Sequence, residues 1–397
     1  MNTPPWEKLL AGDLGELREN HLYRERRVIR CIDPAHVEWC GKRYTNFASN
    51  NYLGLTHHPR LIEAGRDALT RFGAGSGAAS LISGYGPAHA SAEQAIASWK
   101  GSEGAVLLPS GYQANQAAIQ TIAAVGARNP GAVRFLIDKL AHASLIDAVR
   151  GSGAAFRIFP HNHLKKLERL LSEAEEGQLQ VVVTESIFSM NGDAAPLLEI
   201  SLLRKRYAFL LLLDEAHATG VYGPAGEGLA VEMGVKESVD VSVVTFSKAL
   251  GSVGGAICAS SAFCDAVVNR GRAFIYTTCV PPHLAAIAEA AVKVVQEEPQ
   301  RRRRVRELAR RLRDALVQSG WRVASGDSPI IPIVSGTAES ALSAANVLLG
   351  QGMLVGAVRP PTVARGQSRL RITVCSEHTQ QEIDSLAEAL LLLAPPV

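Results

Sequence analysis

Seven short apolar runs, most of them separated by stretches of helical pattern, constrain the fold of this sequence more than any other feature. The runs do not alternate between apolar and polar residues, so each is expected to be a strand buried on both faces of a sheet. Helices that cross over between such strands produce a mostly parallel sheet covered on both sides, which is the α/β class. The expected strands are 105–108, 133–137, 155–159, 181–184, 209–213, 241–246 and 255–259, and the expected helices between the earlier ones are 112–124, 143–151, 163–175 and 197–207.

A length of 397 residues and a change of pattern after residue 290 predict more than one domain. We expect an N-terminal segment at 1–55 with a helix, a basic arm and a hairpin, a large domain at 56–290, and a small α+β domain at 291–397. The glycine-rich stretch 73–86 is interpreted as a flexible connection. In the small domain we expect strands near 321–323, 330–334, 353–358 and 369–374, and helices at 298–318, 338–350 and 379–393.

The charge pattern argues against a protein dedicated to binding nucleic acid. The formal net charge is +3, whereas such proteins carry a concentrated basic surplus. The arginines of 301–313 surround an apolar stripe at helical spacing, so they are interpreted as the solvated face of a helix. His161 and His163 are interpreted as surface residues.

The cysteines and the N-terminus predict a cytoplasmic protein. The six cysteines include no C-x-x-C pair and are interpreted as reduced thiols. The first ten residues contain no signal-peptide core, and no apolar run approaches the ~18 residues that span a bilayer. No metal is expected, since Asp214 and His217 lack a third ligand at the usual zinc spacing.

Polar residues follow several of the expected strands, at the edge of the sheet where α/β proteins bind ligands. Gly111 opens a helix directly after a strand, a natural site for a phosphate. His142 and Ser189 follow two further strands. Asp214 follows the most apolar strand, where an unpaired carboxylate would be costly to bury. Lys248 follows the 241–246 strand and therefore belongs to the same edge.

This combination matches what pyridoxal phosphate (PLP) requires. A lysine forms a Schiff base with the cofactor's aldehyde, and a carboxylate keeps its pyridine nitrogen protonated. A ring stacks on the pyridine, and backbone N–H groups with hydroxyls bind the phosphate. Lys248, Asp214, His142 and the Gly111 corner supply these four functions.

Five motifs in series resemble the α-oxoamine synthases, a family of PLP enzymes, and the resemblance extends from the N-terminal arm to about residue 385. It implies PLP-dependent transferase fold type I, with a mostly parallel seven-stranded sheet in a large domain and a smaller C-terminal α+β domain. The motifs are Asn46-Phe47-Ala48-Ser49-Asn50-Asn51-Tyr52-Leu53-Gly54-Leu55, Ser110-Gly111-Tyr112-Gln113-Ala114-Asn115, Ala141-His142-Ala143-Ser144, Asp214-Glu215-Ala216-His217-Ala218-Thr219-Gly220 and Thr245-Phe246-Ser247-Lys248-Ala249-Leu250-Gly251.

The resemblance also implies residue roles. Lys248, His142 and Asp214 would be catalytic: Lys248 binds the aldehyde and moves protons, Asp214 pairs with the pyridinium, and His142 stacks on the ring. Thr278 would reach a phosphate across a homodimer interface, and Arg371 would bind the amino-acid carboxylate. The implied cofactor-binding residues are Gly111, Tyr112, His142, Ser189, Asp214, His217, Thr245, Ser247, Lys248 and Thr278, and the implied substrate-binding residues are Arg24, Asn50, His142, Thr362 and Arg371.

The stretch Val358-Arg359-Pro360-Pro361-Thr362-Val363 resembles the family members that condense L-alanine with a pimeloyl thioester, carried by coenzyme A or acyl carrier protein (ACP), with loss of carbon dioxide. Three alternatives stay open: another α-oxoamine synthase that uses glycine or serine, a non-catalytic regulatory subunit, and a nucleic-acid binder. The sequence departs from the family pattern at Asn51, at 75–81 and at Ala364, all near expected substrate contacts.

Overall fold

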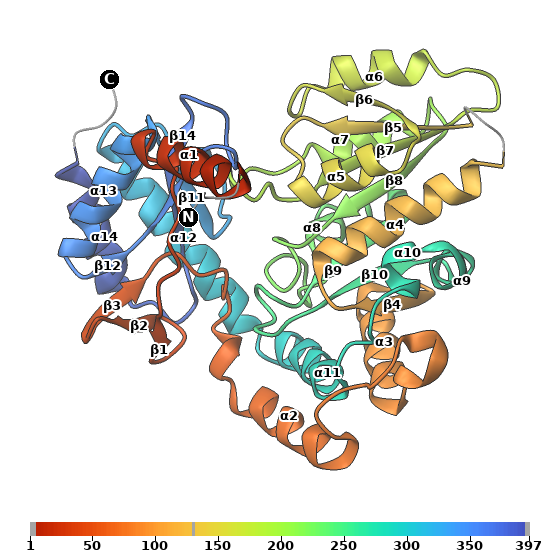
Figure 1. The fold of residues 1–397 in the computed structure, drawn as a ribbon, viewed down its shortest axis with the longest axis horizontal. Helices are drawn as coiled ribbons and strands as arrows, with labels where there is room; N and C mark the ends of the chain where they lie inside the picture. The colour runs from red at the N-terminus through yellow and green to blue at the C-terminus, as the bar shows by residue number, and fades with distance from the viewer. Residues whose placement is uncertain (1–4, 129–131, 394–397) are drawn as a thin grey trace. The chain divides into compact units, whose positions relative to one another are not determined.

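The computed structural model describes residues 5–128 and 132–393, and its contacts divide the chain into two compact units (Figure 1). Unit 1 comprises the chain up to Ser49, residues 190–192 and the chain from Val305, whereas unit 2 comprises 50–189 and 193–304. The N-terminal segment therefore groups with the C-terminal part. The three-part division at 1–55, 56–290 and 291–397 stays a prediction.

Unit 2 is built around a seven-stranded sheet, and the predicted α/β fold is confirmed. The strand order is β4-β10-β9-β8-β7-β5-β6. Strand β10 is antiparallel to both of its neighbours, and the other adjacent pairs are parallel. The strands are β4 (Gly104–Leu108), β5 (Val133–Asp138), β6 (Ala155–Phe159), β7 (Leu179–Glu185), β8 (Phe209–Asp214), β9 (Val241–Thr245) and β10 (Gly255–Ala259).

Helices cover both faces of this sheet, which explains why its strands read as continuous apolar runs. Val181 and Val183 point into a core with α4, α5, α9 and α10, while Val182 between them points into a core with α6 and α7. Complete burial of one such side chain stabilises the fold by about 1.5–3 kcal/mol. These helices are α4 (Gly111–Gly126), α5 (Ala143–Gly151), α6 (Leu164–Ser172), α7 (Leu197–Leu203), α9 (Ser261–Arg270) and α10 (Arg272–Ile275).

The rest of unit 2 is helical, and its glycine-rich segment is more ordered than expected. Helix α11 packs against α2 and α3. Within the segment at 73–86, residues 80–84 form a single π-helical turn, and the Cys279 N–H donates to Ala78 O at 3.0 Å. The expectation of a flexible connection was wrong, because this segment packs against residues 279–280. The remaining elements are η1 (Leu55–His57), α2 (Pro59–Phe72), η2 (Ser80–Gly84), α3 (Pro87–Lys100), α8 (Leu229–Glu232), η3 (Lys236–Ser238) and α11 (Pro282–Glu297).

Unit 1 contains two small sheets. One has the order β1-β2-β3-β12, in which the predicted hairpin of β2 and β3 pairs in parallel with β12, and the other has the order β11-β14-β13 and is antiparallel. Helix α12 starts in unit 2 and continues in unit 1. The elements are α1 (Pro5–Glu19), β1 (Arg30–Cys31), β2 (His36–Trp39), β3 (Lys42–Asn46), α12 (Pro299–Gln318), β11 (Ile330–Gly336), α13 (Ala338–Gly350), β12 (Met353–Leu354), β13 (Gly356–Val358), β14 (Ser368–Thr373) and α14 (Gln380–Leu391).

The strand expected near Trp321 does not form. Gly320 adopts the left-handed conformation (φ 85°) after α12. The Trp321 N–H then donates to Leu316 O at 3.0 Å, and the Gly320 N–H donates to Val317 O. This closing turn folds the buried Trp321 back onto the helix, so its backbone cannot join a sheet.

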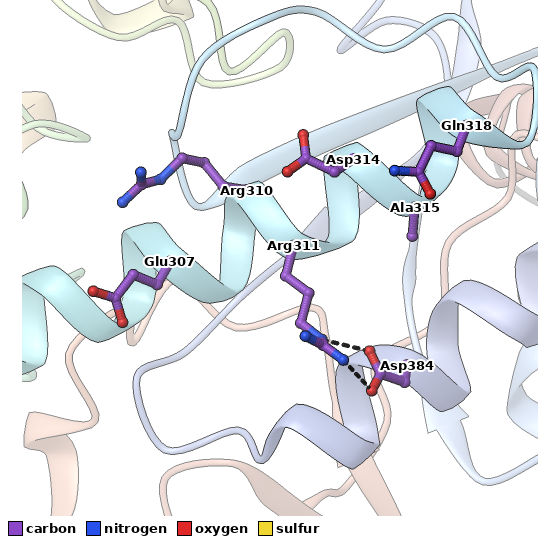
Figure 2. A pocket seen from close by; sticks show the side chains of 7 residues that line it. All are labelled: Glu307, Arg310, Arg311, Asp314, Ala315, Gln318 and Asp384. Atoms are coloured by element: carbon purple, nitrogen blue, oxygen red, sulfur yellow. Dashed lines mark hydrogen bonds and ion pairs between the residues drawn. The ribbon is translucent and has the colours of Figure 1, made fainter.

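The arginines of α12 are largely engaged within the protein. Figure 2 shows Arg311 directed at Asp384, with both guanidinium–carboxylate bonds at 2.6–2.7 Å, in a polar surface cavity of about 520 Å³. Arg306 pairs with Asp327 at 2.8 Å, and the buried Arg313 donates to Ser328 O and Ile330 O. These intramolecular contacts weaken the nucleic-acid alternative. Among the described residues, none of the helices is long and apolar enough to cross a membrane.

Candidate active site

The residues expected to bind a cofactor lie at the carboxyl ends of the parallel strands of unit 2. Asp214 ends β8 and Thr245 ends the neighbouring β9. Lys248 lies three residues after Thr245, and Gly111 begins the helix after β4. The antiparallel β10 lies between β9 and β4, with Gly255 opposite both Thr245 and Leu108. Strand order thus groups residues that are 137 positions apart in the sequence (Gly111 and Lys248).

The Gly111 corner has the geometry of an anion site. Ser110 caps helix α4 by accepting a hydrogen bond from the Gln113 N–H at 3.1 Å. The first N–H groups of a helix lack partners within the helix and attract anions. A Cβ at Gly111 would lie 2.2 Å from Thr245 Cγ2, so the start of the helix packs directly against the end of β9. Only glycine permits this approach.

We predict that Gly111→Ala weakens PLP binding at least ~10-fold and destabilises the protein by about 1–3 kcal/mol, because the new methyl group must push the helix start away from Thr245. Cofactor titration followed by absorbance, together with thermal unfolding, measures both effects. Gly151→Ala is the control, because a Cβ at the helical residue Gly151 meets nothing within 4 Å. Equal PLP affinity in the two variants would contradict the proposed anion site at Gly111.

A buried hydrogen-bond chain joins Asp214 to His142. The two carboxylate oxygens of Asp214 accept from the Ala216 N–H at 2.8 Å and from Asn115 Nδ2 at 2.7 Å. Asn115 Nδ2 also donates to Ser144 Oγ at 2.9 Å, and Ser144 Oγ lies 2.7 Å from His142 Nδ1. Asp214, Asn115 and Ser144 are buried. Two residues without a predicted role therefore connect two predicted catalytic residues.

These contacts assign a neutral tautomer to His142. Its Nδ1 accepts from the Ser144 N–H at 3.2 Å, and Ser144 Oγ, which already receives the Asn115 amide, donates its own hydrogen to the same atom. The proton of the ring therefore lies on Nε2. Desolvation lowers the pKa of His142; Asp214 opposes this shift and Lys248 adds to it. By surface area His142 is an exposed residue. A neutral ring suits stacking.

Lys248 and His217 are held by separate neighbours. Lys248 is half-buried, and its Nζ lies 3.4 Å from Thr245 Oγ1. The buried His217 places Nδ1 2.7 Å from the Tyr52 hydroxyl. That hydroxyl donates to Asn50 Oδ1 at 3.1 Å, so it accepts from His217. Asn50, predicted to bind substrate, is thereby linked to a predicted cofactor ligand.

Glu185 is a buried carboxyl that the sequence reasoning left without a role. It ends β7 and lies opposite Asp214 in the β7–β8 register. Burial, and next the charge of Asp214, raise the pKa of Glu185 well above the usual carboxyl range. Its Oε2 accepts from the Ser189 N–H at 3.3 Å, and Oε1 has no hydrogen-bond partner among the described residues. Glu185 thus holds the backbone of the predicted ligand Ser189.

Three further predicted cofactor ligands, besides His142, are exposed. The Tyr112 ring is 45% exposed, and its hydroxyl donates to Asp147 Oδ2 at 2.9 Å. Ser247 and Thr278 are exposed as well, and the neighbouring Thr277 accepts from Gln113 Nε2 at 3.2 Å. Their roles stay predictions.

The other predicted substrate ligands belong to unit 1, where two of them come together. Arg24 Nη2 donates to Pro360 O at 2.8 Å, and the Thr362 N–H donates to Arg359 O at 3.1 Å. Arg359 in turn donates to the carbonyl groups of His21 and Tyr23. The basic arm and the 358–363 stretch therefore form one structure. Arg371 is buried on β14, opposite Pro332 and Gly356.

Tyr52, Asn115, Ser144 and Glu185 are the residues near this site to which the sequence reasoning gave no role. Asn115 and Ser144 occur in the motifs discussed above, but their spacing does not indicate that one contacts the other. A carboxyl that ends the strand adjacent to Asp214 is the signal that could have identified Glu185.

The comparison that decides the family is a match of the sequence profile "aminotransferase class I and II" to residues 42–390. The chain belongs to the aminotransferase class I and II family. Its seven-stranded unit and its structural neighbours assign this family member to PLP-dependent fold type I, and the resemblance to the α-oxoamine synthases is confirmed. Catalytic machinery of a transferase is therefore expected at the carboxyl edge of the sheet.

Relatives and solved structures agree on this family. An 8-amino-7-oxononanoate synthase from Geobacter sulfurreducens is 39% identical over 383 residues, covering 96% of each chain. A serine palmitoyltransferase from S. paucimobilis, solved with a bound PLP–myriocin adduct, is 29% identical with a TM-score of 0.91, covering 99% of this chain and 98% of its own. An 8-amino-7-oxononanoate synthase from Francisella tularensis is 25% identical with a TM-score of 0.76, covering 88% and 97%.

The residues of this aminotransferase-family chain fit PLP. Gly111 begins a helix whose first N–H groups can bind a phosphate, and it packs so closely against Thr245 that any side chain there would meet it. Asp214 presents a carboxylate fixed by two donors, and His142 presents a neutral ring. Lys248 supplies a primary amine on the adjacent strand end. Phosphate, pyridine nitrogen, ring face and aldehyde each have a matching group.

Proposed function

We propose that this chain is a PLP-dependent acyltransferase that condenses L-alanine with a pimeloyl thioester to give 8-amino-7-oxononanoate, a step of biotin biosynthesis. The observation that carries the chemistry is the buried chain from Asp214 through Asn115 and Ser144 to His142, on the same sheet edge as Lys248. The names of relatives at about 40% identity support the choice of substrates.

In the proposed reaction a carbon–carbon bond forms between Cα of alanine and the thioester carbonyl, while the thiol and carbon dioxide leave. When bound, PLP supplies an aldehyde that captures the amino group and a ring that accepts the electrons released at Cα. The protein supplies everything that positions these groups and moves protons.

The protein groups divide this work between them. Lys248 Nζ removes and returns the proton at Cα, a role suited to a half-buried amine near a hydroxyl. Asp214, held by Asn115 and the Ala216 N–H, would pair with the pyridine nitrogen. Neutral His142 would stack on the cofactor ring, and His217 is oriented by Tyr52. Arg371 binds the alanine carboxylate in a bidentate manner, which a planar guanidinium favours.

The cluster of Arg24, Arg359 and Thr362 supports a charged acyl substrate. Arg359 is buried, and burial followed by repulsion from Arg24 lowers its pKa. The guanidinium groups of Arg24 and Arg359 therefore repel each other, and an anion bound beside them would relieve that repulsion. The terminal carboxylate of a pimeloyl chain, or a phosphate of its carrier, has the required charge.

Product formation with purified, PLP-loaded protein tests the assignment. We expect mass spectrometry to detect the nine-carbon amino ketone from alanine plus pimeloyl-CoA or pimeloyl-ACP, and a visible absorption change on alanine addition that glycine and serine do not match. Parallel assays with both carriers distinguish CoA from ACP. Faster turnover of glycine or serine than of alanine would overturn the substrate assignment while leaving the chemistry intact.

A serine palmitoyltransferase activity is the second candidate, because the serine palmitoyltransferase of S. paucimobilis superposes with the higher TM-score. Backbone similarity reports the fold, whereas substrate choice depends on side chains. The 39% identity to the 8-amino-7-oxononanoate synthase of Geobacter sulfurreducens, against 29% to this serine palmitoyltransferase, favours the first candidate. Palmitoyl-CoA with serine belongs in the same assay.

We also propose a homodimer and a cytoplasmic location. Apolar side chains stay exposed on segments of unit 2 near Thr278, with Ile82 81% and Tyr276 73% exposed, which supports a covering partner subunit. None of the six cysteines, all of which lie among the described residues, forms a disulfide, as is usual in a reducing compartment. A monomer in sedimentation velocity, or recovery outside the cytoplasmic fraction of expressing cells, would contradict these two proposals.

A further inference from the structure

Three loops at the carboxyl edge of the sheet meet at Asp138, His161 and Asp193, which we call the His161 cluster. Asp138 ends β5 and is buried, and its carboxylate accepts from the Leu140 N–H at 2.8 Å and from the Asn162 N–H at 2.9 Å. It therefore shapes both the loop that leads to His142 and the loop after β6. His161 was expected to be an uninvolved surface residue.

His161 connects these two loops to the loop after β7. Its Nδ1 lies 3.0 Å from Asp138 Oδ1 and its Nε2 lies 2.7 Å from Asp193 Oδ2. A carboxylate only accepts hydrogen bonds, so each ring nitrogen must carry a hydrogen. A neutral imidazole has one such hydrogen, and both contacts are satisfied only by the imidazolium. Its side chain is 20% exposed.

The two ends of the loop after β7, which contains Ser189, are joined by backbone hydrogen bonds. The Phe188 N–H donates to Asp193 O at 2.9 Å, and the Ala195 N–H donates to Ser186 O at 3.0 Å. The His161 ring meets the Phe188 ring edge-on at 4.3 Å between centroids. Asn162 Nδ2 adds a bond to Ala194 O at 3.0 Å. The two residues at 161–162 thus contact both ends of this loop.

We infer that His161 is a positioning residue whose positive charge ties together the loops after β5, β6 and β7, and so fixes the backbone that presents His142 and Ser189 at the active site. It contacts neither of these residues directly. Its influence passes through Asp138 to residues 139–142 and through Asp193 and Phe188 to Ser189. The effect on cofactor binding rests on the proposed function, whereas the effect on the loops does not.

The pH dependence follows from the groups that face the ring. Burial lowers the pKa of His161. The hydrogen bonds and charges of Asp138 on β5 and Asp193 on the β7 loop raise it by more than burial lowers it, so that the resulting pKa is about 9. A raised folded-state pKa means that the stabilisation is complete below the unfolded value of roughly 6.5. It is then lost as the pH rises through about 9. The loops should loosen in alkaline solution.

The first test uses wild-type protein without cofactor. NMR of ring-labelled histidine should show His161 titrating near pH 9, assigned by its absence in His161→Gln. His163 is the control, because it is exposed and faces no carboxylate at salt-bridge distance among the described residues. A His161 ring that titrates near ~6.5, the ordinary value, would overturn the inference.

The second test measures hydrogen exchange at the Leu140, Asn162 and Phe188 amides. We expect exchange at least ~10-fold faster in His161→Gln than in wild type, and no change in His163→Gln. The double variant His161→Gln/Asp193→Asn should recover part of the protection, because it removes the unpaired carboxylate. Unchanged protection in His161→Gln would contradict the inference without bearing on the proposed reaction.

The third test measures PLP affinity in the same variants. Looser loops should weaken PLP binding at least ~5-fold in His161→Gln and raise the KM for amino acid more than they lower kcat, because His161 touches no reacting atom. Wild type should show the same weakening above pH 9. A loss confined to kcat would instead indicate a catalytic residue and would overturn the positioning role.

Discussion

Lys248→Ala should abolish the reaction and the covalent attachment of PLP together. We expect kcat/KM to fall at least ~10³-fold, because the variant loses both the amine that bonds to the cofactor and the base that moves the Cα proton. Borohydride reduction of wild-type protein should fix PLP to the peptide that contains Lys248, and the variant should carry no label there. Peptide mapping by mass spectrometry measures this directly.

The matched control is Lys165→Ala, which removes an exposed lysine from α6 and should change neither result. Lys248 is half-buried beside Thr245, so its replacement leaves only a small gap and should hardly alter thermal unfolding. A label on another lysine, or activity of Lys248→Ala within ~10-fold of wild type, would contradict the catalytic role of Lys248.

Asp214→Asn should lower kcat/KM by roughly 10²–10³-fold, the range typical of losing one preorganised electrostatic contact. The amide cannot hold a proton on the pyridine nitrogen, so the ring accepts electrons less readily. Folding should survive. Asn115 Oδ1 has no hydrogen-bond partner among the described residues, so rotation of the Asn115 amide offers an acceptor to the new amide of the variant.

Steady-state kinetics and thermal unfolding separate these effects, and Asp240→Asn is the control. Asp240 precedes β9 at the opposite edge of the same sheet, where it accepts from the Leu211 N–H and pairs with Arg204. Its replacement should cost stability on the order of 1 kcal/mol and leave kcat/KM unchanged. If Asp214→Asn kept kcat/KM within ~3-fold of wild type, the pyridine-nitrogen role would be wrong.

The local sequence pattern predicted the strands of unit 2 well, and it predicted less well the segments where the chain turns back on itself. The seven strands lie within a few residues of the apolar runs, because a strand buried on both faces must be apolar throughout. Trp321 shows the limit: an apolar residue after a helix is buried equally well by a Gly320 turn or by a strand, and only the turn forms. The order of the 80–84 turn likewise depends on residues 279–280, distant in sequence.

The candidate site divides in the same way. Lys248, Asp214 and His142 could be selected from sequence, because each follows a strand and all carboxyl ends of parallel strands meet at one edge. Their partners could not. Asn115 reaches Asp214 across 99 positions, and Arg24 reaches Pro360 across 336. Such contacts depend on strand order and on side-chain direction, neither of which is encoded within a short window.

By itself the sequence determined the α/β class, the edge that holds the chemistry and the lysine on which the proposed function depends, since these follow from periodicity and from the position of polar residues after apolar strands. The tertiary structure alone decided how those residues are prepared for chemistry: His142 made neutral by Ser144, Asp214 fixed by Asn115, and His161 kept charged between two carboxylates. The physical reason is that a protonation state depends on the atoms facing each nitrogen or oxygen, and folding brings those atoms from distant parts of the chain.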